Sequence, residues 1–107
     1  MFKIVAEPQF THTVKVRVPV DGGHEEQSFK ARFRVVDAEE LARVERDEGR
    51  RAAIRRILVS MEELADAEGN LVSYSDALRD QLLQQTYVEI AIYLTYLDGV
   101  TGAKTGN

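Results

Sequence analysis

The sequence predicts an α+β fold, with an N-terminal antiparallel sheet of two to three strands followed by three to four helices. Apolar and polar residues alternate in the first third of the chain, as in strands with one buried face. After Asp37 the apolar residues recur at helical spacing instead. The chain has 107 residues, of which 44% are hydrophobic and 30% charged, so we expect a single domain over 1–107.

A hairpin over 13–36 is the main predicted element of the sheet. Valines alternate with basic residues in Thr13–Val20, and phenylalanines, alanine and valine do so in Ser28–Val36. Between them lies Asp21-Gly22-Gly23, whose glycines adopt positive φ without steric cost. We therefore expect two half-buried strands with a basic outer face.

A third strand is predicted over Phe2–Ala6, ended by Pro8, so that the sheet occupies 1–36. A hairpin alone is marginally stable, because one of its faces stays open to water. The helices of the following segment must therefore cover its valine and phenylalanine face.

The helical part is predicted over 37–98. Asp37 and Glu40 have the spacing of a capping box, and Gly49 interrupts the helix or joins two helices. An amphipathic stripe follows, made of Ala53, Ile54, Ile57, Leu58 and Met61. The turn at 67–70 is flanked by Val59–Leu64 and Leu71–Tyr74, which fit either a helix end with a loop or a small second hairpin.

Two further helices complete the predicted helical part. Ser75 has the position of an N-cap, and Thr86 with Glu89 forms a second capping-box pattern. The last helix is expected to run to about Asp98, with Gly99 and Gly102 ending it. Residues 99–107 are then expected to form a flexible tail.

Charge and composition exclude several classes of site. The net charge of −4 argues against nucleic acid as the main partner. No cysteine is present, which excludes disulfides and thiolate chemistry and fits a reducing cytosol. The N-terminal residues show no secretory signal, and 87–97 is too short an apolar stretch to span a bilayer, which takes about 20 residues. We expect a cytoplasmic protein.

No motif indicates catalysis, a metal or a cofactor. His12 and His24, the latter beside Glu25 and Glu26, lack the spacing of a metal site and fit exposed strand and turn positions better. No serine lies in a nucleophile elbow, adjacent carboxylates on a helix point apart, and no phosphate-binding glycine loop occurs. We therefore expect a protein that is not an enzyme, without catalytic, cofactor-binding or metal-binding residues.

An arginine-rich segment offers one alternative function. Arg43, Arg46 and Arg50 fall at i, i+3 and i+7 on one helical face, which would suit contacts to nucleic-acid phosphates. Acidic residues are interleaved at spacings that allow ion pairs along a helix. A solvated helix with paired charges is the simpler interpretation, and nucleic acid is not the expected partner.

The last predicted helix is apolar on more than one face. An ordinary surface helix needs one apolar stripe, so a helix that is apolar all round is buried or meets a partner. From the residues alone a central position in the core is the simpler interpretation, but three tyrosines in so short a chain suggest an interface, where tyrosine is enriched. The candidate partner-binding residues are Tyr87, Ile90, Tyr93, Leu94, Tyr96 and Leu97.

Several segments together resemble a known family. They are Phe2-Lys3-Ile4-Val5, Pro8-Gln9-Phe10-Thr11, Val18-Pro19-Val20-Asp21-Gly22-Gly23, Glu26-Gln27-Ser28-Phe29-Lys30-Ala31-Arg32-Phe33-Arg34-Val35, 66–75, the tyrosine-rich helix and 101–107. In their order and spacing they resemble the tail assembly chaperones of long-tailed phages and prophages. The resemblance covers nearly the whole chain, and Met61 departs from it where many such sequences have tryptophan.

The resemblance implies a non-enzymatic role in virion morphogenesis. Such chaperones bind the tape-measure protein, keep it soluble, and help the tail-tube protein assemble around it in the host cytoplasm. The implied partners are the tape-measure protein and the tail-tube protein, with a homo-oligomer left open and no membrane involved. The alternatives are a virion structural part, such as a head–tail connector or tail-completion protein, and a small nucleic-acid-binding regulator.

Overall fold

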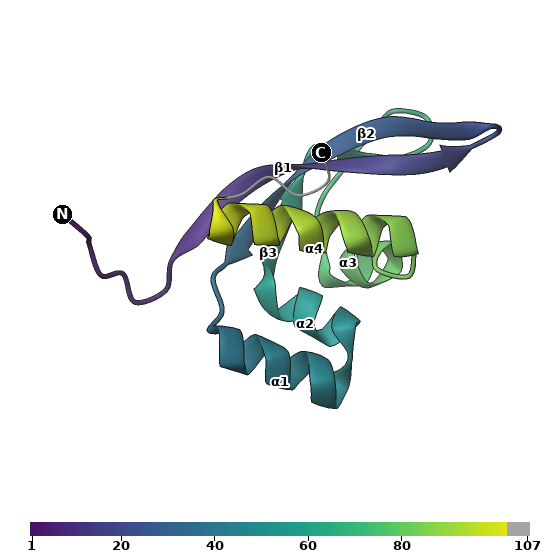
Figure 1. Ribbon diagram of the computed structural model, residues 1–107. Helices are drawn as coiled ribbons and strands as arrows, with labels where there is room; N and C mark the ends of the chain where they lie inside the picture. The colour runs from purple at the N-terminus through teal and green to yellow at the C-terminus, as the bar shows by residue number, and fades with distance from the viewer. Residues whose placement is uncertain (103–107) are drawn as a thin grey trace.

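The α+β fold is confirmed by the computed structural model, which describes residues 1–102 (Figure 1). The elements, in chain order, are β1 (Gln9–Val20), β2 (Gly23–Arg34), α1 (Ala38–Glu48), α2 (Arg50–Ile57), β3 (Leu58–Glu62), β4 (Leu64–Ala65), β5 (Leu71–Val72), α3 (Asp76–Leu82) and α4 (Thr86–Thr101). The sheet lies on one side of the molecule, and the helices cover one of its faces.

The predicted hairpin is present and is longer at its start than the sequence indicates. β1 and β2 pair antiparallel from Gln9–Arg34 to Val20–Gly23, and Gly22 turns the chain with φ of 78°. Its strands extend beyond the helices at the turn end (Figure 1). The inward-facing apolar side chains are buried, namely Val14, Val16, Phe29, Ala31 and Phe33. β2 ends at Arg34, two residues before the predicted end of the strand, and Val35 and Val36 lead into α1.

The third strand is not the predicted one. Phe2–Ala6 forms no strand; it projects from the start of β1, away from the body of the molecule (Figure 1). β3 takes the third place instead, antiparallel to β2, in the order β1-β2-β3. Pro8 is followed directly by β1, which leaves no turn that would fold the segment back onto its neighbour. β3 in turn buries Leu58 and Met61 against the core.

The stripe predicted after Gly49 is divided between a helix and a strand. Gly49, with φ of 98°, separates α1 from α2, and Ala53, Ile54 and Ile57 are fully buried on α2. The helix ends at Ile57, where the chain becomes extended and pairs with β2. Asp37 is the N-cap of α1 but makes no side-chain cap hydrogen bond, so the first predicted capping box is wrong.

The segment 59–74, for which the sequence allowed two interpretations, contains a small hairpin. β4 pairs with β5, and the turn between them is organised by Asp66, whose Oδ1 accepts hydrogen bonds from the backbone N–H groups of Glu68 (3.0 Å) and Asn70 (2.9 Å). Ser75 caps α3 as predicted, since its Oγ accepts a hydrogen bond from the Leu78 N–H at 3.0 Å. The part predicted as helical over 37–98 therefore includes three short strands.

The last helix is longer than predicted. Gln85 rather than Thr86 is its N-cap and makes no side-chain cap bond, so the second predicted capping box is also wrong. Gly99 lies inside the helix, and the left-handed Gly102, with φ of 71°, follows its end. Of the predicted flexible tail, 99–101 is helical, and 103–107 lies outside the described residues.

The two faces of the sheet differ in chemistry. α4 packs chiefly on β1, and α2 lies against β2, so the helices share the inner face between the edge strand and the middle strand. The outer face is basic, as predicted, and carries Lys15, Arg17, Lys30, Arg32 and Arg34. One of these, Arg32, is fixed by hydrogen bonds to the side chains of Gln9 (3.1 Å) and Thr11 (3.2 Å).

Candidate partner-binding surface

One side of α4 belongs to the core. Val88, Ile92 and Tyr96 are buried against the sheet, and a Cβ atom at Gly99 would overlap the ring of Phe10. The Tyr96 ring stacks on Phe10 and meets Phe33 edge-on, with centroids 6.1 and 5.6 Å apart. This side of the helix accounts for three of its ten apolar residues.

A second side of α4 is held to α2 by charge. The carboxylate of Glu89, which is 8% exposed, lies between two arginines at the start of α2. Its Oε1 is 3.4 Å from the Nε of Arg50, and its Oε2 is 3.4 Å from the Nε of Arg51. Both guanidinium groups remain half-exposed, so the pairs fix the position of the helix more than they strengthen the core.

The side of α4 that faces away from the sheet is apolar and open. Ile90, Leu94 and Val100 are 40%, 38% and 40% exposed, with half-buried tyrosines and leucine beside them. We call this surface the outer face of α4; its exposed residues are Ile90, Leu94 and Val100, and Tyr87, Tyr93 and Leu97 at its borders are half-buried and pack against the core. A 16-residue helix is about 24 Å long, so the face is a stripe that fits one helix of a partner.

Tyr93 lies where the outer face meets α1. Burial raises the pKa of its hydroxyl, and the negative charge of Glu45 on α1 adds to that shift. The hydroxyl is therefore neutral at physiological pH. It offers a polar edge to an apolar stripe, as tyrosines at protein interfaces do.

Of the six predicted binding residues, Ile90 and Leu94 are exposed on the outer face, Tyr87, Tyr93 and Leu97 are half-buried at its borders, and Tyr96 is not part of it. Tyr96 is 2% exposed, and its hydroxyl oxygen accepts a hydrogen bond from the Val36 N–H, so it is a core residue. The sequence prediction omits Val100 because it ends the helix near Asp98, before Gly99. The helix ends before Gly102 instead, because of these two glycines only Gly102 has the positive φ of a helix C-cap.

The arginine-rich segment does not form one basic helix face. The break at Gly49 places Arg43 and Arg46 on α1 and Arg50 on α2, so the predicted i, i+3, i+7 face is divided. Most of these side chains are paired with carboxylates: Arg46 with Asp47, Arg50 and Arg51 with Glu89, Arg55 with Asp80, and Arg56 with Glu40. The segment joins helices to one another and offers few free cations.

The two histidines are placed far apart on the hairpin. His12 lies opposite Ala31, and His24 lies opposite Pro19, seven positions along the same ladder. At about 3.3 Å per residue the separation is about 23 Å, too far for one metal ion to bind both. Over residues 1–102, no group of three or more His, Cys, Asp or Glu side chains has the geometry to hold a metal ion.

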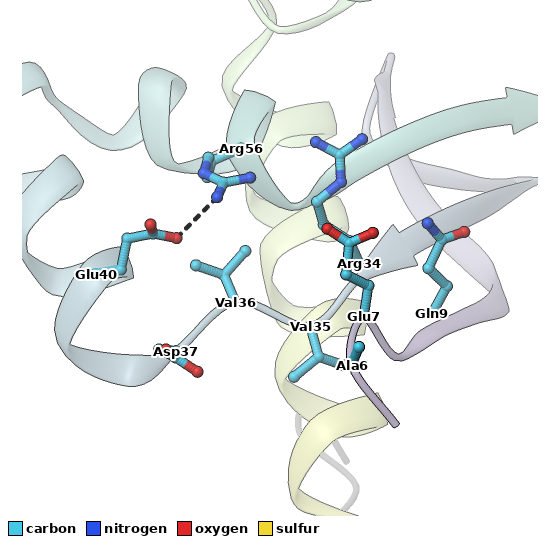
Figure 2. Close-up of a pocket in the computed structure, with 9 residues that line it drawn as sticks. All are labelled: Ala6, Glu7, Gln9, Arg34, Val35, Val36, Asp37, Glu40 and Arg56. Carbon is cyan, nitrogen blue, oxygen red and sulfur yellow. Dashed lines mark hydrogen bonds and ion pairs between the residues drawn. The ribbon is translucent and has the colours of Figure 1, made fainter. Parts of the chain in front are cut away.

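A hollow of about 410 Å³ lies between the N-terminal segment, the end of β2 and the first turns of α1 (Figure 2). Its charged side chains have both signs, and on its helix side Arg56 donates a hydrogen bond to Glu40 at 3.0 Å. The hollow is lined by Ala6, Glu7, Gln9, Arg34, Val35, Val36, Asp37, Glu40 and Arg56. It lacks the apolar lining typical of a small-molecule site.

Comparison with models of protein families found no match for this chain, and neither curated proteins nor solved structures gave one. None of the helices in the described part of the chain has the length and apolar character needed to cross a membrane. The outer face of α4 is therefore the surface on which a functional proposal rests.

Proposed function

We propose that this chain is a non-enzymatic tail assembly chaperone of a long-tailed phage or prophage, which binds the tape-measure protein through the outer face of α4. The sequence resemblance names the class of partner. The observation that carries the proposal is the set of exposed apolar side chains of Ile90, Leu94 and Val100 on a helix whose opposite side is already in the core. The resemblance places this activity in the host cytoplasm, together with the tail-tube protein.

The chemistry of the stripe suits a long helical client. An amphipathic helix binds by laying its own apolar residues along such a stripe, with anchors at i, i+4 and i+7. Ile90, Leu94 and Leu97 have this spacing. Each of these side chains is partly covered by its own chain, so we expect a single contact with the client to be weak. A client with many such segments would be held by many copies of this chain at once. It could still be released, because each contact is weak.

The proposal is tested by co-expression with the tape-measure protein encoded near this chain. The expected result is that the tape-measure protein stays in the soluble fraction and co-purifies with this chain, and aggregates when expressed alone. Equal solubility with and without this chain, and no complex, would refute the proposal.

A structural part of the virion, such as a connector or tail-completion protein, is the main alternative. The two differ in what the finished particle contains, because a chaperone leaves and a connector stays. Mass spectrometry of purified virions is expected to find the tape-measure protein and not this chain. Stoichiometric amounts of this chain in the particle would favour the alternative.

A further inference from the structure

The N-terminal segment Phe2–Ala6 has the composition of a strand, and no strand among residues 1–102 pairs with it. Its apolar side chains are open to solvent, with Phe2 90%, Ile4 93% and Val5 60% exposed. The local sequence of Phe2–Ala6 favours a strand. The segment forms none, because no neighbouring strand lies beside it in the described part of the chain. Large apolar side chains left this exposed indicate a missing contact.

Within residues 1–102 the sheet has a free edge that suits such a strand. β1 is an edge strand over all twelve of its residues. Natural proteins protect edges with charge and proline, and Lys15, Arg17 and Pro19 do so in the half nearest the turn. The other half, Gln9–Val14, has neither, and its six residues are enough to pair with the five of Phe2–Ala6.

The position of α4 shows where the side chains of an added strand would go. α4 packs chiefly on β1, while α2, to which Glu89 is paired, lies toward β2. The inner face of the sheet at its edge strand is therefore covered by α4. A strand added beside β1 would place alternate side chains, such as Phe2 and Ile4, on this same inner face, next to α4.

We propose that Phe2–Ala6 of one copy of this chain adds as a β-strand to the free edge of β1, at Gln9–Val14, in a second copy. The segment cannot reach its own β1, because it continues straight from Pro8 into that strand, and Figure 1 shows it leading away from the body. The exchange covers the exposed apolar side chains of the segment and pairs the unprotected half of the sheet edge. It is independent of the client proposed above.

Sedimentation velocity over a range of protein concentrations tests the exchange. The wild-type chain is expected to self-associate as its concentration rises, and the double variant Phe2→Ser with Ile4→Ser is expected to remain monomeric. A monomeric wild type, or equal self-association of the variant, would overturn the proposal. Backbone amides of Phe2–Ala6 are also expected to be protected from hydrogen exchange only in the associated wild type.

A cross-link tests the site of contact, since the chain has no cysteine of its own. Ile4→Cys combined with His12→Cys, in the edge half of β1, is expected to give covalent dimers on mild oxidation. The matched control combines Ile4→Cys with Leu71→Cys, because Leu71 is an exposed apolar residue away from β1. Equal dimer yields from the two pairs, or an internal cross-link within one chain, would exclude docking of the segment beside β1 of a second copy.

Discussion

The hydroxyl oxygen of Tyr96 accepts a hydrogen bond from the backbone N–H of Val36 at 3.1 Å, in the interior of the protein. The two residues are 60 positions apart in the chain. Val36 follows the sheet and precedes α1, so this bond fixes α4 to the point where the strands give way to the helices. Replacing Tyr96 by phenylalanine keeps the ring and leaves a buried N–H without a partner.

Tyr96→Phe is therefore expected to lower the free energy of unfolding by about 1–3 kcal/mol, the usual cost of a buried unsatisfied donor. Tyr93→Phe is the matched control, because Tyr93 is half-buried on the same helix and its hydroxyl makes no such buried backbone bond. Urea unfolding of both variants measures the difference. Equal losses would show that the Tyr96 hydroxyl contributes nothing specific.

Glu89→Gln is expected to loosen the contact between α4 and α2. The variant removes the charge that Arg50 and Arg51 share, and we expect a loss of about 1–2 kcal/mol in unfolding free energy, because both arginines are half-exposed and solvent weakens the pairs. Added salt should reduce the difference from wild type. Glu48→Gln, at an exposed position of α1, serves as the control. A loss of the same size there would contradict this role of Glu89.

Gly99→Ala tests the close approach of α4 to β1. Alanine is the better helix former by about 1 kcal/mol, yet its Cβ would overlap the ring of Phe10. We expect net destabilisation of about 1–3 kcal/mol, the usual cost of overpacking. The double variant with Phe10→Leu should lose less than the sum of the two single variants, as thermal unfolding would reveal. Simple additivity would mean that the two residues do not constrain each other.

Asp66 gives the β4–β5 turn a pH dependence. Backbone N–H donation from Asn70 is the main cause that lowers the pKa of its carboxyl group below 3.8, with further hydrogen bonds from Glu68 and the Asn70 side chain. Because the pKa is lower in the folded state, the contribution to stability is present above the unfolded value and is lost as the pH falls through the folded value. A carboxyl-carbon NMR titration is expected to show a midpoint below 3.8. A midpoint at or above that value would contradict the hydrogen-bonded turn.

Local features of the fold were predictable from the sequence, and long-range ones were not. The hairpin follows from alternation around a glycine turn, and the Ser75 cap from a side chain three residues before the N–H that it binds. The third strand depends on which segment can reach β2, and Leu58–Glu62 reaches it where Phe2–Ala6 does not. Alternation identifies a segment that can form a strand but does not identify its neighbour.

The candidate partner-binding surface on α4 was also predictable from the sequence only in its local features. That α4 is apolar all round was visible in the sequence, but which side faces the sheet was not. Tyr96 and Tyr93 differ by three residues and have different roles, because Tyr96 points to Phe10 and Phe33 and Tyr93 points toward α1. Glu89 was expected to cap its own helix, and its pairing with α2 depends on a contact that only the folded chain creates.

The most direct test of the proposed function is co-purification of the tape-measure protein with a variant of the outer face of α4. Ile90→Gln with Leu94→Gln replaces two exposed apolar residues by good helix formers, and Leu71→Gln with Val72→Gln makes the same change on β5 as a control. We expect the α4 variant to fold with near wild-type stability and to lose the soluble complex, whereas the β5 variant keeps it. Retention of the complex by a folded α4 variant would contradict the claim that this face binds the client.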